Sequence, residues 1–170
     1  MQTNASVLET IWLADDDADD RLVFEIAIKE ISPQALLHTI DDGLQLIKQL
    51  NAAPILPHLL FLDLNMPCKN GKECLAEIRE IKRFKALPIV VYSSADQVND
   101  VNHAYGLGAN LYVKKPGKYG DMVRLLKEVL HLNWKDPKGI AIAHFIGNNY
   151  VPFRSNARKP DVKPTNLPSA

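Results

Sequence analysis

Five short apolar runs, spread over the first 130 residues and separated by helical patterns, constrain the fold of this chain more than any other feature. Each run holds four or five residues, which suits a β-strand and is too short for a helix. The runs cover residues 10–14, 36–40, 59–62, 89–92 and 111–114. Strands that alternate with helices pair in parallel, because each crossover helix returns the chain to the same end of the sheet. The pattern predicts an α/β fold, a doubly wound five-stranded parallel sheet with helices on both faces.

Three helical patterns, two between these runs and one after the last run, each carry an apolar face. The first follows Asp17 and Asp19, which are candidate N-caps; the second follows Gly71 and ends before Pro88; the third covers residues 121–130. The side chains expected to face the core are Leu22, Val23, Ile26 and Ala27 in the first helix, Cys74, Leu75, Ile78 and Ile81 in the second, and Met122, Leu125, Leu126 and Val129 in the third.

The last 40 residues differ from the rest in charge and proline content. The whole chain has 20 basic and 20 acidic residues, but residues 131–170 hold six basic and two acidic ones and five of the eleven prolines. Residues 140–146 are apolar enough for a strand or a docking segment, whereas residues 152–170 hold few large apolar side chains to offset the entropy of ordering them. We therefore expect one domain over residues 8–130, a C-terminal extension over residues 131–151 as a candidate for docking on that domain, and a flexible tail over residues 152–170.

The balanced charge excludes broad electrostatic binding to nucleic acid or to an anionic membrane, because such binding depends on an excess of Lys and Arg. No apolar run approaches the roughly 18 residues of a membrane span, and no basic residue precedes Arg21 as a secretory signal would require. Cys68 and Cys74 are too few for a disulfide framework and lack the neighbours of a zinc site. These features predict a cytoplasmic protein with two reduced thiols and no contact with a membrane.

Polar side chains stand at the carboxyl ends of four of the five expected strands. Asp15 and Asp16 follow the first strand, Asp63 the third, Ser93 the fourth and Lys115 the fifth. The carboxyl ends of parallel strands open on one edge, where loops and helix N-termini form ligand sites. Clustered carboxylates there need a counter-cation, and carboxylate, carbonyl and water oxygens are the ligands that Mg²⁺ prefers. With a hydroxyl and an ammonium group facing the same cleft, the set suits a phosphoryl group held on a carboxylate, for which Asp63 is the best candidate.

Several motifs, in this order along the chain, resemble the receiver domain of bacterial two-component response regulators. They are Asp15-Asp16 after an apolar strand, Asp63-Leu64-Asn65-Met66-Pro67 followed by Gly71, Ser93-Ser94, Gly108-Ala109 before Tyr112, and Lys115-Pro116. No single motif is decisive, but all of them in order on the ends of the expected strands are specific. The resemblance covers roughly residues 8–130 and implies a flavodoxin-like sheet with the strand order 2-1-3-4-5.

The resemblance also implies roles for the acidic residues. Asp63 would be the phosphoacceptor, receiving its phosphoryl group from a phosphohistidine of a sensor histidine kinase or a histidine phosphotransfer protein. Asp15 and Asp16 would hold Mg²⁺ together with Asp63 and the backbone carbonyl of Asn65. The only chemistry expected of the chain itself is self-phosphorylation from small donors and slow self-dephosphorylation, so we do not expect an enzyme.

Further residues would bind and report the phosphoryl group. The Ser93 hydroxyl would bond one phosphoryl oxygen, and Lys115 would pair with another across a cis peptide bond to Pro116. Tyr112 occupies the aromatic switch position, and its ring would move inward as Ser93 is drawn toward the phosphoryl group. Tyr92 is bulkier than the aliphatic residue usual before the switch hydroxyl, which predicts crowding of Tyr112.

The residues that follow the expected domain limit the kind of output that the protein can have. Forty residues that are poor in core side chains are too few for a helix-turn-helix domain, which needs roughly 60 ordered residues. We therefore expect no DNA-binding domain. The sequence favours a single-domain regulator that acts by contact with another protein, either an unidentified target or a further phosphotransfer protein to which it relays the phosphoryl group.

Several assignments remain open at this point. In a haloacid-dehalogenase-type phosphatase Asp15 would be the nucleophile, although Asp63 would then be unexplained. The fold could also serve as an interaction module that needs no phosphate. Asp17 is a candidate either for metal binding or for capping the first helix, and Trp134 either for anchoring the extension or for binding a partner.

Overall fold

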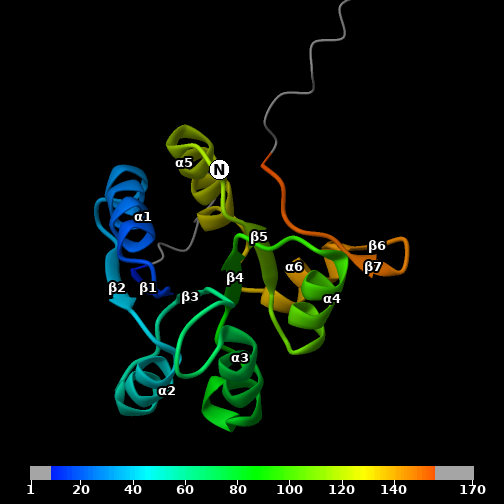
Figure 1. The fold of residues 1–170 in the computed structure, drawn as a ribbon, viewed down its shortest axis with the longest axis horizontal. Helices are drawn as coiled ribbons and strands as arrows, with labels where there is room; N and C mark the ends of the chain where they lie inside the picture. Colours follow the sequence, from blue (N-terminus) through cyan, green and yellow to red (C-terminus); the bar gives the residue numbers. More distant parts are fainter. Residues whose placement is uncertain (1–8, 156–170) are drawn as a thin grey trace, which may run out of the picture.

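The computed structural model describes residues 9–155 and shows five parallel strands in one sheet (Figure 1). The strands are β1 (Thr10–Ala14), β2 (Leu36–Ile40), β3 (Leu59–Leu62), β4 (Ile89–Ser93) and β5 (Leu111–Lys114). Their order in the sheet is β2-β1-β3-β4-β5, so β1 pairs with both β2 and β3. The predicted α/β fold and strand order are confirmed, and β4 runs one residue further than predicted, to Ser93.

Among the described residues, five helices cover the two faces of this sheet. One face carries α1 (Ala18–Ile31) and α5 (Tyr119–Leu130), which lie beside each other. The other carries α2 (Gly43–Ala52), α3 (Gly71–Glu80) and α4 (Val98–Gly106), and a short 3₁₀ helix (Lys82–Phe84) follows α3. Each face therefore has its own hydrophobic core, as expected for a parallel sheet.

The strand β3 shows how the two cores meet in the middle of the sheet. Leu60 and Leu62 enter the core under α2, α3 and α4, whereas Leu59 and Phe61 enter the core under α1 and α5. All four side chains are fully buried, which is why this strand is apolar without interruption. The strand that leads to Asp63 is thus held from both sides.

The buried face of α1 differs from the prediction. The sequence predicts an inward face of Leu22, Val23, Ile26 and Ala27. In the structure the buried side chains of α1 are Phe24, Ala27 and Ile28. Leu22 is 56% exposed and Ile26 is 50% exposed. Both sets fit a helical spacing, but the helix turns the larger Phe24 inward, where its ring packs edge-on against Phe61 at a centroid distance of 5.0 Å.

The inward faces predicted for the other two helices are confirmed. The helix α3 buries Cys74, Leu75 and Ile78, and Ile81 is partly buried just beyond its end. The helix α5 buries Met122, Leu125, Leu126 and Val129. Each of these helices has a single apolar stripe, so its spacing leaves no second face to choose.

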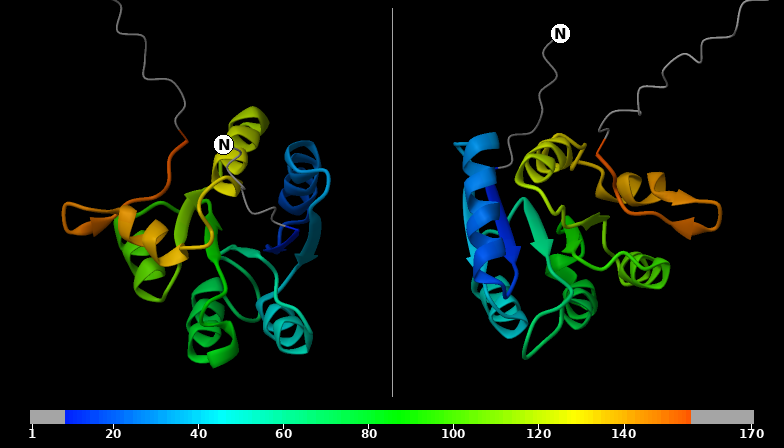
Figure 2. Two further views of the ribbon diagram at one scale, coloured as in Figure 1. Left: turned by 180° about the vertical axis from the view of Figure 1, so that it is seen from behind. Right: turned by 45° about the horizontal axis from the view of Figure 1, so that its top comes forward.

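The segment after α5 folds back against the sheet and α4 (Figures 1 and 2). It contains α6 (Pro137–Ala143) and a hairpin of β6 (Phe145–Ile146) and β7 (Asn149–Tyr150). Residues 140–146, for which the sequence predicts a strand or a docking segment, thus form the end of a helix and then a short strand. Trp134 is only 6% exposed, and its indole N–H donates to the carbonyl of Val129 at 2.8 Å. This contact supports the interpretation of Trp134 as an anchor of the extension.

Residues 152–155, which the sequence places in the tail, also contact the sheet. The N–H of Phe153 donates to the carbonyl of Tyr112 at 2.7 Å, and Phe153 forms a parallel bridge with Val113. Residues 156–170 lie outside the described part of the chain. Within residues 9–155 no helix has both the length and the apolar character needed to cross a membrane.

Candidate functional site

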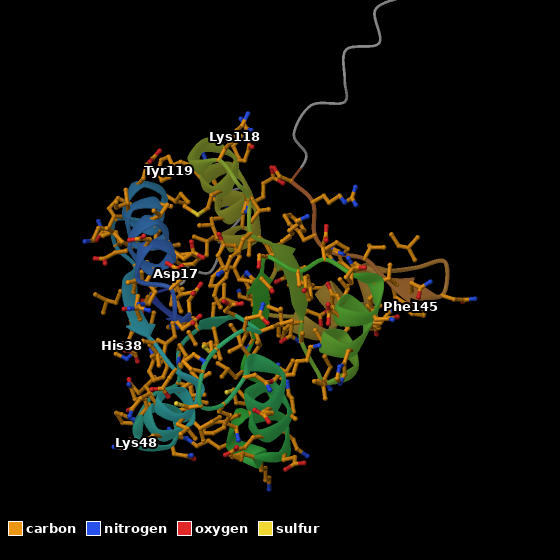
Figure 3. The ribbon with its side chains drawn as sticks, in the orientation of Figure 1. Asp17, His38, Lys48, Lys118, Tyr119 and Phe145 are labelled. Carbon is orange, nitrogen blue, oxygen red and sulfur yellow. The ribbon has the colours of Figure 1, made fainter. Side chains whose placement is uncertain are left out.

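The carboxyl ends of three strands bring three predicted site residues to one edge of the sheet. Asp15 directly follows β1, Asp63 follows β3 and Lys115 follows β5. An open hollow of about 540 Å³ lies there, next to the start of α1, which Asp17 marks in Figure 3. The side chains that line this hollow include Asp16, Asp63, Asn65, Ser94 and Lys115. The edge therefore offers a polar site that is open to solvent on one side.

Three carboxylates meet at this edge. One oxygen each from Asp15, Asp16 and Asp63 lies within 4.8 Å of the others. Asp15 and Asp63 are buried, whereas Asp16 is exposed. Oxygen donors at this spacing, with one side open to water, suit a hard divalent cation that keeps part of its hydration shell. The donor set therefore fits a divalent metal ion.

The ammonium group of Lys115 lies among these acids. Its Nζ is 2.7 Å from Asp15 Oδ2, 2.8 Å from Asp20 Oδ2 and 3.2 Å from Asp63 Oδ2. Burial acts to lower the pKa of Lys115, but the hydrogen bonds to Asp15 and Asp20 and the nearby negative charges outweigh it and hold the pKa above its usual range. Lys115 is therefore charged at neutral pH. The described residues contain no cis peptide bond, so the Lys115–Pro116 bond is trans and the expected cis bond is wrong.

Asp15 is fixed in place by its own neighbours. It is fully buried, and this burial raises the pKa of its carboxyl group, although the hydrogen bond from Lys115 opposes the rise. The N–H of Asp17 donates to Asp15 Oδ1 at 3.0 Å, and Arg21 Nη1 donates to the Asp15 carbonyl at 2.7 Å. Both the side chain and the backbone of this acid are thus held before any ligand binds.

Asp17 acts as the N-cap of α1. Its Oδ1 accepts the backbone N–H groups of Asp19 at 2.8 Å and of Asp20 at 3.0 Å. The hydrogen bonds from Asp20 and Asp19 lower the pKa of Asp17, because they stabilise its charged form. The structure therefore supports capping rather than metal binding for Asp17. Sequence reasoning missed the contact of Asp20 with Lys115, although a carboxylate three residues after a cap lies in the first helical turn, beside the strand ends.

The turn after Asp63 is held by the start of α3. A Cβ atom on Gly71 would overlap the backbone carbonyl of Asp63, so only glycine permits this close approach. The N–H of Gly71 donates to the Leu64 carbonyl at 2.9 Å. Asn70 and Glu73 form a capping box that fixes the first turn of the helix. The position of Asp63 is therefore set from both ends of its loop.

The two serines after β4 have different surroundings. Ser93 is fully buried, and its Oγ accepts the N–H of Ala95 at 3.3 Å. Ser94 is exposed and lines the hollow. Successive side chains along a strand point in opposite directions, which accounts for the difference. Ser94, and not the predicted Ser93, is thus the serine that lines the hollow; the sequence motif contains Ser94, but the reasoning from sequence did not single it out.

Tyr112 is fully buried in this structure. Its hydroxyl donates to the carbonyl of Ala95 at 2.8 Å, and its backbone N–H donates to Tyr105 Oη at 3.0 Å. Burial raises the pKa of Tyr112 to about 12. The ring therefore already occupies the inward position that the resemblance implies for the switch.

Tyr92 does not crowd Tyr112, so that prediction is wrong. The two rings lie on opposite faces of the sheet: Tyr92 belongs to the core under α1 and α5, and Tyr112 to the core under α2, α3 and α4. Tyr92 packs edge-on against Phe24 at a centroid distance of 5.5 Å. The Nζ of Lys115 lies 5.7 Å from the centroid of the Tyr92 ring, at a distance that allows a cation–π contact. Tyr92 therefore supports the site from the side of α1.

A comparison with protein families decides what this arrangement is. A family model described as the response regulator receiver domain matches residues 11–127. The chain belongs to this family. Receiver domains are signalling modules of two-component systems and are generally not enzymes. Membership therefore favours the receiver interpretation over the phosphatase alternative.

Similar receivers are found among both relatives and solved structures. The chain is 32% identical over 125 residues to response regulator Rcp1 of Synechocystis sp., a match that covers 70% of this chain and 84% of Rcp1. The structure of the phosphorylated cyanobacterial phytochrome response regulator RcpA gives a TM-score of 0.67 at 29% identity, over 71% of this chain and 90% of that one. The Mn²⁺-bound form of Rcp1 gives 0.65 at 28% identity, over 71% and 91%. This chain thus resembles response regulators that it matches over most of their own length.

Proposed function

We propose that this receiver is a cytoplasmic single-domain response regulator that accepts a phosphoryl group on Asp63 and signals by contact with another protein. The donor is a phosphohistidine of a sensor histidine kinase or a histidine phosphotransfer protein. One observation carries the proposal: Asp63 is 5% exposed, directly follows a fully buried strand and lies 3.2 Å from the Lys115 ammonium group. A carboxylate held in this way is positioned as a nucleophile next to a cation that can receive the incoming charge.

The transfer itself needs little from the protein besides positioning. An oxygen of the Asp63 carboxylate forms a bond to phosphorus, while the bond from phosphorus to the histidine nitrogen breaks and its electron pair stays on the imidazole. Lys115 then pairs with one phosphoryl oxygen, and the Ser93 hydroxyl group donates a hydrogen bond to another. The product carries about two negative charges, and Lys115 and Ser93 stabilise these charges by direct contact.

Mg²⁺ is the cation that we propose for the three acids. Its ligands are Asp15, Asp16 and Asp63, with the backbone carbonyl of Asn65 as a further oxygen. When bound, the ion neutralises negative charge on the phosphoryl oxygens. Lys115 draws Asp15 and Asp63 together through its Nζ, and so holds the oxygen donors close to one another.

The exposed apolar side chains of α1 form the proposed contact surface for the phosphodonor. Leu22 and Ile26 are exposed and do not belong to the core, and they lie on the helix whose first turn borders the hollow. Val23 lines a neighbouring cavity together with Asp20 and Lys115. Apolar side chains beside a reacting group suit an apolar helical face of a partner.

The function is tested by phosphorylation from a small donor. The protein is incubated with acetyl phosphate and Mg²⁺, the acyl phosphate is reduced with borohydride, and the modified residue is identified by mass spectrometry. We expect modification of Asp63 in the wild type and none in Asp63→Asn. The matched control is Asp41→Asn, which changes an exposed acid after β2, and it should be modified as the wild type is.

Two results would contradict the proposal. Modification of Asp15, or rapid turnover of phosphomonoesters, would favour the phosphatase alternative. A target protein that binds the wild type and Asp63→Asn equally, with and without acetyl phosphate, would favour an interaction module that needs no phosphate.

A further inference from the structure

The surface made by α4, β5 and α5 is covered by the end of the described chain. Residues 144–155, here called the C-terminal strap, include the hairpin of β6 and β7 and the residues that follow it. Figures 1 and 2 show the hairpin beside α4 and the end of the strap passing toward α5, and Figure 3 labels Phe145 on the hairpin. The surface nearest to the Tyr112 side of β5 is therefore occupied by a segment of the same chain.

The strap is tied to α4 by three contacts. The Asn149 side-chain oxygen accepts from Asn102 Nδ2 at 2.9 Å, and the N–H of Tyr150 donates to Asn102 Oδ1 at 2.7 Å. The Tyr150 ring stacks on Tyr105 with a centroid distance of 4.3 Å and an interplanar angle of 11°. Reciprocal amide bonds and a stacked ring pair specify one position of the hairpin on this helix.

The strap continues over the other two elements. The N–H of Phe153 donates to the Tyr112 carbonyl on β5 at 2.7 Å. Ser155 Oγ donates to Glu128 Oε1 on α5 at 2.6 Å. The Phe153 side chain is partly buried against the core under α1 and α5. Contacts to all three elements make the strap an intramolecular ligand of this face.

A chain of contacts connects the strap to the phosphoacceptor site. Ser93 Oγ accepts the N–H of Ala95, and the carbonyl of Ala95 accepts the Tyr112 hydroxyl. The N–H of Tyr112 donates to the hydroxyl of Tyr105, on which Tyr150 is stacked. A group that binds Ser93 therefore acts on the same loop that holds Tyr112 inward.

The loop after β4 is separated from part of the strap by a cavity. A cavity of about 450 Å³ lies between them, lined by Asp96 of the loop and by Tyr150 and Arg154 of the strap. The contacts of the strap with the Tyr105 ring and with the Tyr112 carbonyl do not involve this loop, so a displacement of the loop toward Asp63 leaves them in place. Docking of the strap and the inward position of Tyr112 are therefore compatible with an occupied phosphoryl site.

We propose that docking of the C-terminal strap and phosphorylation of Asp63 stabilise the same conformation, so that each favours the other. The inference rests on the proposed function, because it needs a phosphoryl group that binds Ser93. Phosphorylation then holds the strap more tightly on α4 and β5, and a docked strap raises the affinity of the site for the phosphoryl group, since coupling between two sites is reciprocal. A partner that binds the bare α4–β5–α5 face must displace the strap, and the phosphorylated protein resists it.

The test uses the full chain with Mg²⁺ and beryllofluoride, a mimic of the phosphoryl group. Hydrogen exchange is measured for the amides of Tyr150 and Phe153, and ¹⁹F NMR measures the bound fluoride. We expect exchange at these amides to slow at least about 5-fold when beryllofluoride binds. Tyr150→Ala should weaken beryllofluoride binding at least about 5-fold, whereas Tyr150→Phe, which keeps the stacked ring, should bind as the wild type does.

A control variant separates this effect from general damage to the hairpin. Ile146→Ala changes an exposed apolar residue of the same hairpin and should leave beryllofluoride binding unchanged. Unchanged or faster exchange of the strap, with the ¹⁹F signal of bound fluoride present, would overturn the coupling and leave the proposed function intact. No bound signal at all would overturn the proposed function, and this inference with it.

Discussion

Lys115 places one ammonium group among three carboxylates, two of which are buried. Replacing it with methionine, which keeps much of the side-chain volume, leaves Asp15 and Asp63 without a cation. We expect Lys115→Met to lower the free energy of unfolding by about 3 kcal/mol in EDTA, because an unpaired buried charge is costly. Mg²⁺ should recover much of this loss, since the ion supplies the missing positive charge. Urea unfolding with and without Mg²⁺ measures both effects.

The neighbouring lysine provides the matched control for this variant. Lys114 pairs with Asp96 at 2.6 Å, but both side chains are exposed. Lys114→Met should therefore change the free energy of unfolding by less than about 1 kcal/mol, with no dependence on Mg²⁺. Equal effects of the two substitutions would show that Lys115 does not balance the acidic cluster.

The two cysteines should differ sharply in reactivity. Cys68 is exposed, whereas Cys74 is fully buried, and burial raises the pKa of the Cys74 thiol to about 11. Because the thiolate is the reactive form, we expect iodoacetamide at mildly alkaline pH to modify Cys74 at least about 100-fold more slowly than Cys68. Mass spectrometry of the labelled peptides gives the two rates, and labelling in denaturant is the control.

The same pKa fixes the sign of a pH effect. The unfolded chain loses the Cys74 proton near its ordinary pKa of 9.0, and the folded chain keeps it to about 11. The free energy of unfolding should therefore fall as the pH rises between these values. Similar labelling of both thiols in the native protein would mean that the core under α2 and α3 opens readily.

At the scale of the element, the start of α3 depends on the absence of a side chain at Gly71. A methyl group there would overlap the Asp63 carbonyl, so Gly71→Ala must displace either α3 or the turn that carries the phosphoacceptor. We expect a loss of about 2–3 kcal/mol in the free energy of unfolding. The yield of phosphorylated Asp63 with acetyl phosphate should fall as well.

Gly120 offers the same substitution without the overlap. It lies in the first turn of α5, and no atom would contact a Cβ placed on it. Gly120→Ala should raise the free energy of unfolding by up to about 1 kcal/mol, because alanine favours a helix. If the two variants changed the free energy of unfolding equally, the close approach of α3 to Asp63 would not contribute to stability.

The elements of the receiver were predictable from sequence to different degrees. Short apolar runs bounded by polar residues located every strand of the sheet, because parallel strands are buried on both faces. The order of the strands came from the resemblance and not from periodicity. The prediction of the inward face of α1 was wrong, because that helix has two apolar stripes and only packing against Phe61 decides which of them is buried.

The site was predictable where it depends on the topology of the sheet. Asp15, Asp63 and Lys115 follow strands whose carboxyl ends share one edge, so their convergence follows from the fold class. The contact of Asp20 with Lys115 was missed because it depends on the rotation of α1. The exposure of Ser94 rather than Ser93 depends on side-chain direction at the end of β4, which a motif does not specify.

At the scale of the whole molecule, the extension contributes to the core through Trp134. Its indole belongs to the core under α1 and α5. We expect Trp134→Ala to lower the free energy of unfolding by about 3–5 kcal/mol, as for other buried aromatic residues. Thermal unfolding measures this loss, and Ile142→Ala, measured in the same way, is the control. Ile142 is 71% exposed, so its substitution should change the free energy by no more than about 0.5 kcal/mol.

The docking of the extension is the part of the fold that the sequence predicted least. Its contacts join residues that lie far apart in the chain, such as Asn102 with Tyr150 and Val113 with Phe153. The strands β6 and β7 have two residues each, too short for a periodic pattern. If Trp134→Ala had the same free energy of unfolding as the wild type, the extension would lie on the surface without stabilising the core.

The bridge between Phe153 and Val113 has a consequence for how copies of this chain meet at high concentration. β5 is the last strand of the sheet, and an uncovered last strand is a template on which further chains can polymerise. The segment that runs along β5 blunts this template. A protease that cut the chain at Gly147 would separate this segment from the domain. If the cleaved segment then dissociated, the edge of β5 would be exposed, and the protein should aggregate.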